Sequence, residues 1–347
     1  MPLMTRIPAR SGSLAALLAV SVLTLTACGG ESGGGAKSAS DFDAAYVMSD
    51  NLGDKGFNDS AAAGFKKAED EGVGTKLLQA SPSDPQTWRQ NLEEVSGSGK
   101  YDLIFTGPGM HDNLAAVAPQ HPDQKYVFFD DELDAPNVLS VRYAQNEGSY
   151  LAGILAATAS KDTTSFPLSK NTDKVGVVAG QDLPGIQDFI VGFKQGVAQV
   201  DPAMKVQVSF VGNFNDAQKA YDLTKTMYQG GTDVVYNVSG PAGLGILKAA
   251  ADTGHYAIGV DSDQNSLYPK NVLASMLKQI GTSVHASINQ AKDGEIEYGK
   301  TVIYGLDNDG VDFVYNDALV PDSAKKAVSD ARTDVVDGKV KVASVLK

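Results

Sequence analysis

The stretch GDKGFNDSAAAGFKKA, Gly53–Ala68, follows the apolar run Ala44–Met48 and decides the fold class. Alanine, tyrosine and valine in the run favour a buried strand, and the first glycines of the stretch mark a turn. Asn58 and Asp59 are typical helix N-cap residues, and a helix is expected over Ser60–Glu71. The stretch therefore predicts a strand–turn–helix unit.

This unit recurs along the chain. The expected strands are 44–48, 103–106, 126–129, 138–141, 175–179, 206–211, 234–237, 257–260 and 272–275. Segments with helical spacing separate them, such as Gln145–Ser160 and Ala217–Gln229. Apolar runs joined by helical crossovers predict parallel sheets that are buried on both faces. Because the pattern occurs once up to residue 141 and again from residue 175, the sequence predicts an α/β protein with two lobes.

The N-terminus has the features of a lipoprotein signal peptide. Arg6 and Arg10 provide positive charge, and Ser13–Ala27 is an apolar segment too short for an ordinary membrane span. It ends in LTAC, Leu25–Cys28, which fits a lipobox whose cysteine thiol receives a diacylglyceryl group. We therefore expect residues 1–27 to be a leader. A plain signal peptide with an incidental cysteine is the alternative.

Cys28 is the only cysteine of the chain, which excludes an intramolecular disulfide. Residues 28–40 are rich in glycine and serine and are expected to form a flexible tether, with ends roughly 20 Å apart. The expected location is therefore the extracytoplasmic face of the cell membrane, with the lipid on Cys28 as the anchor.

The charge of the chain limits its partners. It has 42 acidic and 29 basic residues, which gives a formal net charge of −13. Nucleic-acid binding requires patches of lysine and arginine, so the sequence argues against it. The acidic balance also argues against tight adhesion of the folded body to anionic lipid.

Short polar residues and glycines follow the expected strands in both halves. Asp50 and Asp130 do so in the first half, and Gly240 and Asp261 do so in the second. Ligands of open parallel sheets bind beyond the carboxyl ends of the strands, so two such arrays would form one enclosed site. For any one position, a turn residue or a helix cap is the simpler interpretation.

Two aromatic residues, Phe57 and Phe214, lie in the same loops. Phenyl rings suit a flat ligand ring, with about 0.5–1.5 kcal/mol per stacked pair beyond area burial. Only three arginines lie outside the leader, whereas a carboxylate or phosphate ligand favours bidentate arginine. We therefore expect a neutral ligand that contains a flat ring.

Catalytic and cofactor motifs are weak. The four histidines have neither metal-ligand spacing nor a nucleophile partner. GPAGLG, Gly240–Gly245, lacks the Lys-Ser/Thr of a phosphate loop and the spacing of a dinucleotide fingerprint. LDNDGVD, Leu306–Asp312, lacks ligands of a calcium loop. We expect no enzyme activity, no cofactor and no metal.

Four motifs together resemble the basic membrane protein family of substrate-binding lipoproteins. The best-understood type in this family is a purine-nucleoside receptor that feeds an ABC importer. The motifs are GDKGFNDSAAAGF (53–65), NEGSYLAGILAA (146–157), GNFNDAQKAYDLTKTMYQGGTDVVYNVSGPAGLGIL (212–247), and IGVDSDQ (258–264) followed by ASMLKQI (274–280). They span most of the chain beyond the leader, and their combination is specific.

The resemblance implies the type I periplasmic-binding-protein fold, which has two Rossmann-like lobes, three crossings and the ligand in between. On this basis we expect a first lobe of residues 41–143 plus about 264–302. The second lobe would contain residues 144–263 plus about 303–347.

The resemblance also implies a set of ligand contacts. Phe57 and Phe214 would stack on the two faces of a purine. Asp50 and Asp130 would form hydrogen bonds with the base, and Asn58 would lie nearby. Asp261 and Lys278 would grip the ribose hydroxyls, and Gly240 would offer a backbone contact. Asn51, beside Asp50, leaves the base preference open.

The implied partners are a purine nucleoside, an ABC permease and the membrane, the last through the lipid on Cys28. Three alternatives stay open on the sequence. The first is a receptor of the same fold for a sugar or another small polar ligand. The second is a ligand sensor, and the third is a surface enzyme such as a nucleoside hydrolase.

Overall fold

A computed structural model describes residues 41–346, and it begins with the expected strand–turn–helix unit. β1 (Asp43–Val47) is buried along its whole length, and α1 (Phe57–Asp70) buries Phe65 and two alanines of one face. The apolar spacing of the sequence is therefore realised as a strand and a helix that share one core.

The start of α1 differs from the sequence prediction. Gly56 occupies the N-cap position, and no side chain at that position caps the helix. The Asp54 carboxylate instead accepts hydrogen bonds from the backbone N–H groups of Asn58 and Asp59, at 2.8 and 3.1 Å. The prediction that Asn58 and Asp59 are the caps is wrong, because Asp54 already satisfies the free N–H groups of the first turn.

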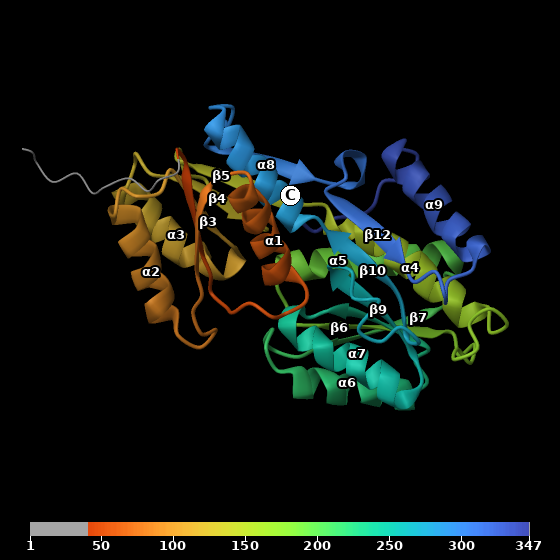
Figure 1. The fold of residues 1–347 in the computed structure, drawn as a ribbon. Coiled ribbons are helices and arrows are strands. Elements are labelled where there is room, and N and C mark those ends of the chain that lie inside the picture. Colours follow the sequence, from red (N-terminus) through yellow and green to blue (C-terminus); the bar gives the residue numbers. More distant parts are fainter. Residues whose placement is uncertain (1–40, 347) are drawn as a thin grey trace, which may run out of the picture. The chain divides into compact units, whose positions relative to one another are not determined.

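The first lobe contains a parallel six-stranded sheet in the order β11-β5-β4-β3-β1-β2 (Figure 1). Its other strands are β2 (Gly74–Leu78), β3 (Leu103–Thr106), β4 (Lys125–Phe129), β5 (Val138–Tyr143) and β11 (Lys300–Tyr304). Four helices cover it: α1, α2 (Pro85–Gly97), α3 (His111–Val117) and α8 (Ile280–Lys292). α1 packs against α8, and α2 packs against α3.

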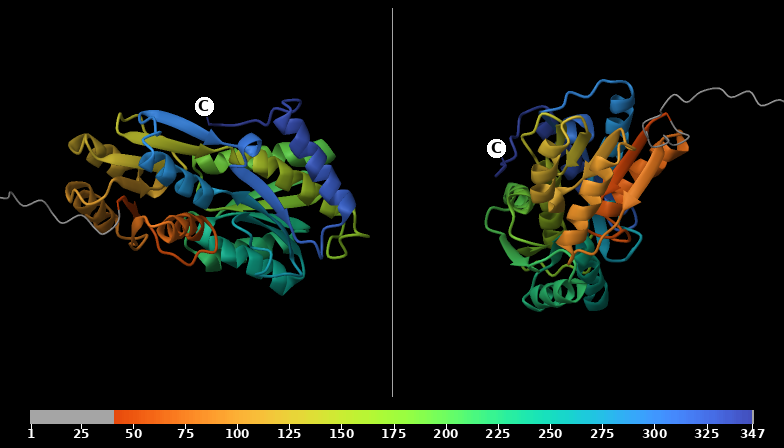
Figure 2. Two further views of the ribbon diagram at one scale, coloured as in Figure 1. Left: turned by 45° about the horizontal axis from the view of Figure 1, so that its top comes forward. Right: turned by 90° about the vertical axis from the view of Figure 1, so that its left-hand side faces the viewer.

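The second lobe repeats this strand order as β12-β10-β9-β8-β6-β7, with only the β10–β12 pair antiparallel. Its strands are β6 (Lys174–Ala179), β7 (Lys205–Phe210), β8 (Val234–Val238), β9 (Tyr256–Asp261), β10 (Val272–Lys278) and β12 (Val311–Tyr315). Its helices are α4 (Gln145–Lys161), α5 (Pro184–Val200), α6 (Ala217–Gln229), α7 (Gly243–Thr253) and α9 (Asp322–Val336). α6 and α7 lie side by side in both views of Figure 2. The predicted α/β class with two parallel-dominated lobes is confirmed.

Three connections pass between the sheets: β5 runs into α4, β10 into α8, and β11 into β12. β10 was expected in the first lobe, but it pairs with β9 and β12 in the second sheet. A strand buried on both faces carries no pattern that tells which sheet it joins, so spacing alone could not place it.

The two connecting helices approach their neighbours at backbone distance. A Cβ added at Gly64 of α1 would lie 2.3 Å from the carbonyl oxygen of Gly281 in α8. A Cβ added at Gly196 of α5 would lie 2.0 Å from the carbonyl oxygen of Tyr150 in α4. Only glycine permits such contacts, so these positions fix where the connections enter each lobe.

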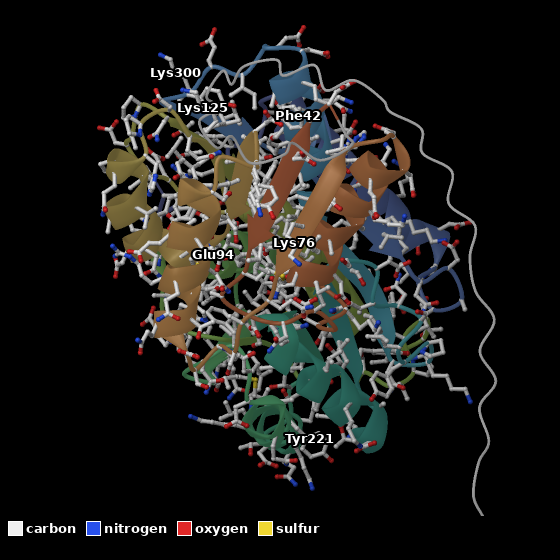
Figure 3. All side chains as sticks on the ribbon, turned by 60° about the vertical axis from the view of Figure 1, so that its left-hand side comes forward. Phe42, Lys76, Glu94, Lys125, Tyr221 and Lys300 are labelled. Atoms are coloured by element: carbon white, nitrogen blue, oxygen red, sulfur yellow. The ribbon has the colours of Figure 1, made fainter. Side chains whose placement is uncertain are left out.

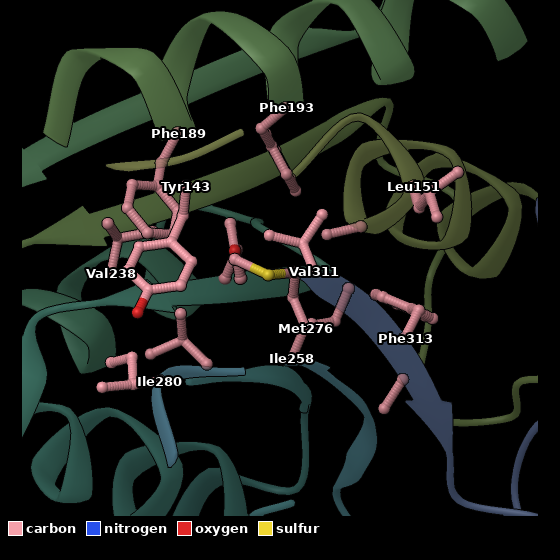
Figure 4. Close-up of a cluster of buried hydrophobic side chains, with 14 of the residues drawn as sticks. Tyr143, Leu151, Phe189, Phe193, Val238, Ile258, Met276, Ile280, Val311 and Phe313 are labelled. Atoms are coloured by element: carbon pink, nitrogen blue, oxygen red, sulfur yellow. The ribbon is translucent and has the colours of Figure 1, made fainter. Parts of the chain in front are cut away.

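An apolar cluster joins the ends of the three connections (Figure 4). Tyr143 ends β5, Ile280 begins α8 and Val311 begins β12, and all three are buried in this cluster. The crossings therefore share one core between the lobes.

Three strands, β2, β11 and β12, were not predicted from the sequence. β2 and β11 are the two edges of the first sheet, and their residues are largely exposed or half-buried. Lys76 of β2 and Lys300 of β11 are exposed (Figure 3). Lysine on an edge strand discourages pairing with another chain, and it also removes the apolar run by which a strand is recognised.

The predicted leader, the tether and Cys28 lie outside the described residues. Within residues 41–346, no helix combines the length and the apolar character needed to cross a bilayer.

Candidate functional site

Two aspartates occupy the same place in the two lobes. Asp130 directly follows β4, and Asp261 is the last residue of β9, and these strands hold equivalent positions in the two sheet orders. Their φ angles are +65° and +67°. The left-handed region is uncommon for residues with a Cβ, although aspartate tolerates it, and such residues cluster at functional sites. The repeated conformation therefore marks the carboxyl ends of β4 and β9 as a candidate site.

Lys278, the last residue of β10, links the two lobes. Its Nζ lies 2.7 Å from Asp130 Oδ1, and its side chain is only 3% exposed. Burial raises the pKa of Asp130, and the Lys278 ammonium opposes that rise by its charge and its hydrogen bond. Because β10 belongs to the second sheet and β4 to the first, this ion pair spans the interface between the lobes.

Three aromatic rings surround the Lys278 ammonium. Its Nζ lies 4.9 Å from the ring centre of Phe189, 5.5 Å from that of Tyr143 and 5.7 Å from that of Phe57. The faces of aromatic rings attract cations, and the attraction is stronger when water is excluded. Phe189 of α5 and Tyr143 of β5 (Figure 4) belong to this candidate cluster and were not predicted, because their spacing also fits ordinary core packing.

Asp261 is a largely buried carboxylate for which residues 41–346 provide no hydrogen-bond donor. It is 8% exposed, and no hydrogen bond to its carboxylate is found among residues 41–346. The pKa of Asp261 is raised to about 7, mainly by burial and also by the charges of Asp130 and Asp54, while Lys278 opposes the rise. Because no donor of the described residues is bonded to this carboxylate, its oxygens are open to hydrogen bonds from outside the protein.

Asp50 makes a further contact across the interface. It follows β1 and accepts a hydrogen bond from the backbone N–H of Asn51 at 2.8 Å. Burial raises the pKa of Asp50, whereas this bond and a hydrogen bond from the side chain of Asn215 lower it. Asn215 lies in the loop after β7 of the second lobe and was not among the predicted ligand contacts.

The two predicted aromatic residues are each seated on their own lobe. The ring of Phe57 lies 5.6 Å from that of Phe129, measured between ring centres. The ring of Phe214 lies against Gly180, where an added Cβ would come within 2.2 Å of its Cδ1 atom. Among the residues that the structure describes, Phe57 and Phe214 make no ring contact with each other. The glycine after β6 therefore provides the space that Phe214 occupies.

Gly240 and Asn58 complete the predicted set. Gly240 has a φ of +53°, and a Cβ added there would lie 3.6 Å from Phe214. Asn58 is buried, and its Oδ1 accepts a hydrogen bond from the Tyr46 hydroxyl at 3.0 Å. The structure thus places the Asp130 carboxylate and the Phe57 ring beside the Lys278 ammonium. The side-chain carbonyl of Asn58 faces the first lobe's own core.

Other kinds of site find less support. In the described part of the chain, no group of three or more His, Cys, Asp or Glu side chains could hold a metal ion. One surface hollow of about 480 Å³ lies over α6 and α7, and another of about 260 Å³ lies beside the β11–β12 crossing. Neither hollow is lined by a predicted site residue, and neither contains the chemistry of the Lys278 cluster.

Comparison with known proteins assigns the family. Residues 42–343 match the Bmp family, described as ABC transporter substrate-binding protein PnrA-like. The chain belongs to this Bmp family. The expected resemblance is therefore confirmed, and with it the role of a substrate-binding protein of the ABC-transporter type.

The Bmp protein is similar to two curated relatives over most of its length. It is 33% identical to the ABC transporter nucleoside-binding protein BmpA of Lactococcus lactis, over 96% of this chain and 98% of that one. It is 27% identical to basic membrane protein A2 of Borrelia garinii, over 85% of this chain and 86% of the relative.

A crystal structure of an ABC transporter solute-binding protein from Aeropyrum pernix superposes with a TM-score of 0.76. The two chains are 24% identical, and the match covers 86% of the Bmp protein and 92% of that chain. At this identity the likeness concerns the fold, and it confirms the type I periplasmic-binding-protein arrangement.

Replacing Asp261 with asparagine should stabilise the Bmp protein at pH 8 but not at pH 4. The pKa of about 7 lies above the ordinary 3.8, so the fold favours the protonated carboxyl. That contribution to stability is complete below about pH 4 and is lost as the pH rises through about 7. Asparagine stays neutral, so the variant should gain roughly 1–4 kcal/mol over the wild type at pH 8.

Thermal unfolding at pH 4 and pH 8 measures this difference. Asp263→Asn, a change at an exposed acid two residues away, is the matched control. If the difference in melting temperature between Asp261→Asn and the wild type were the same at both pH values, the assigned titration would be wrong.

Proposed function

We propose that this Bmp protein is a lipid-anchored receptor on the outer side of the membrane, which captures purine nucleosides between its lobes and delivers them to an ABC permease. The observation that carries the proposal is the Lys278 cluster, in which charged and aromatic groups from both lobes meet. Similarity to a nucleoside-binding protein of Lactococcus lactis supports the ligand class.

The base would lie between Phe57 and Phe214. These residues belong to opposite lobes, and each ring is seated against its own lobe. Aromatic side chains stack on any purine face, which provides affinity without fixing the base. Asp50 and Asp130 would accept hydrogen bonds from N–H groups at the edge of the base. Asn58 would lie behind these residues, held by the hydrogen bond that it accepts from the Tyr46 hydroxyl.

The ribose would lie toward Asp261 and Lys278. Ribose hydroxyls are donors, and the Asp261 carboxylate lacks protein donors among the described residues. The Lys278 ammonium could donate to a hydroxyl oxygen while it keeps its bond to Asp130. The backbone N–H of Gly240 would provide a further donor beside Phe214.

The electrostatics favour a nucleoside over a nucleotide. Asp50, Asp54, Asp130 and Asp261 approach the site. The charges of two cations, Lys278 and Arg142, act on Asp130. A phosphate group would meet these carboxylates, and Arg142 already pairs with Glu132 at 3.0 Å. A neutral ligand whose donors face the acids fits this charge pattern.

Capture would be a conformational equilibrium and not a covalent reaction. A ligand that contacts both lobes favours the arrangement in which both sets of contacts form. The permease would then receive the protein in that arrangement. We assign no catalytic residue.

Phe214→Ala should weaken the affinity for inosine about 5- to 150-fold, because stacking of a base on an aromatic ring contributes roughly 1–3 kcal/mol. Isothermal titration calorimetry with inosine, guanosine and adenosine measures the effect. Phe42→Ala is the matched control, since Phe42 precedes β1 at the opposite end of the strand (Figure 3).

If the affinity of Phe214→Ala for the nucleosides were unchanged, Phe214 would not be part of the binding site. Two control ligand assays separate the alternatives. Binding of ribose without binding of inosine would indicate a sugar receptor of the same fold. Release of free hypoxanthine from inosine would indicate a hydrolase.

Cys28→Ser should release the protein from the membrane, because the thiol that carries the lipid is gone. Fractionation of cells that produce the wild type, Cys28→Ser or the tether control Ser32→Ala measures the distribution. We expect only Cys28→Ser to leave the membrane fraction. A variant that still sediments with membranes would contradict lipid anchoring at Cys28.

A further inference from the structure

Beside the Lys278 cluster, a second pair of contacts joins the lobes without using a predicted ligand residue. Gln264 Nε2 donates to the carbonyl oxygen of Lys55 at 3.1 Å, and Ser262 Oγ donates to that of Gly56 at 3.2 Å. Ser262 and Gln264 follow β9 in the second lobe, whereas Lys55 and Gly56 precede α1 in the first. Both contacts therefore exist only while the lobes are together.

The donor side of this pair is held firmly by the second sheet. Gln264 is buried, and its Oε1 accepts a hydrogen bond from the backbone N–H of Val260 at 3.1 Å. Its own backbone N–H donates to Ser275 Oγ at 3.0 Å. The Gln264 amide is thus fixed by β9 and β10, with its Nε2 left for the opposite lobe.

The acceptor side is fixed as well. The Asp59 carboxylate accepts hydrogen bonds from the backbone N–H groups of Gly53 and Lys55, at 2.7 and 3.0 Å. Asp54 Oδ1 accepts one from the N–H of Gly56 at 3.0 Å. Lys55 has a φ of +52° within this turn. Two acids therefore hold in place the peptide groups that Gln264 and Ser262 reach.

We propose that Ser262 and Gln264 are positioning residues that hold the turn before α1 against the second lobe and so place Phe57 for ligand binding. Phe57 directly follows Gly56, and Ser262 directly follows Asp261, so each end of the Ser262 bond is one residue from a proposed ligand contact. The bonds favour closure before any ligand arrives, which raises the apparent affinity of a ligand that needs the closed form. The inference rests on the proposed function for the identity of the ligand.

Ser262→Ala tests the proposal with little disturbance, because it removes one hydroxyl from a half-buried position. Small-angle X-ray scattering of the ligand-free protein should give a larger radius of gyration for Ser262→Ala than for the wild type. Affinity for inosine should fall about 2- to 12-fold, the loss expected for one hydrogen bond. Ser262→Thr keeps a hydroxyl and should restore both values.

Ser98→Ala is the matched control. Ser98 Oγ also donates to a backbone carbonyl, that of Val95 at 2.8 Å, but both residues belong to the end of α2 within the first lobe. It should leave the radius of gyration and the affinity unchanged. If Ser262→Ala changed only the melting temperature, as Ser98→Ala can, the positioning role would be overturned.

Gln264→Met removes the second donor, and it should increase the radius of gyration further if the melting curve shows a folded protein. If the wild type bound no nucleoside, the proposed ligand would be refuted. The scattering of the ligand-free proteins would still test whether Ser262 and Gln264 favour closure. Equal ligand-free scattering of the wild type, Ser262→Ala and Gln264→Met would overturn the inference.

Discussion

The buried ammonium of Lys278 is the charge on which the arrangement of both lobes depends. Removing a charge from water costs several kcal/mol unless good partners replace the water. Here Asp130 lies 2.7 Å away and the rings of Phe189, Tyr143 and Phe57 surround the group. Because Asp130 and Phe57 belong to one lobe and Lys278 and Phe189 to the other, the charge is fully compensated only while the lobes are together. The electrostatic stability of the site therefore depends on the relative position of the two lobes.

The repeated strand order explains how the partners of Lys278 reach the same place. β4 and β9 are equivalent strands, and their ends present Asp130 and Asp261 in the same left-handed conformation. The three connections pass through one apolar cluster, and glycine contacts set α8 on α1 and α4 on α5. The same architecture that makes each sheet stable therefore turns both sets of strand ends toward the interface.

The sequence predicted the strands that are apolar throughout, such as β6, and missed β2 and β11, whose exposed lysines interrupt the apolar pattern. The rule that ligands bind beyond strand ends found Asp130 and Asp261, and the resemblance to the family supplied Lys278. Phe189 and Gln264 escaped because their roles depend on which side of α5 or β9 meets the other lobe. That geometry is tertiary, and helical or strand spacing does not contain it. The prediction that Asn58 and Asp59 cap α1 was wrong. Asp54, inside the turn, accepts the hydrogen bonds from the first backbone N–H groups of the helix.

The most direct test of this account is a crystal structure of the protein with inosine. The account predicts the purine between the rings of Phe57 and Phe214, with ribose hydroxyls on Asp261 and Lys278 and with Asp130 still paired to Lys278. A structure in which inosine occupies a surface hollow, or in which Phe57 and Phe214 have no contact with the base, would contradict it.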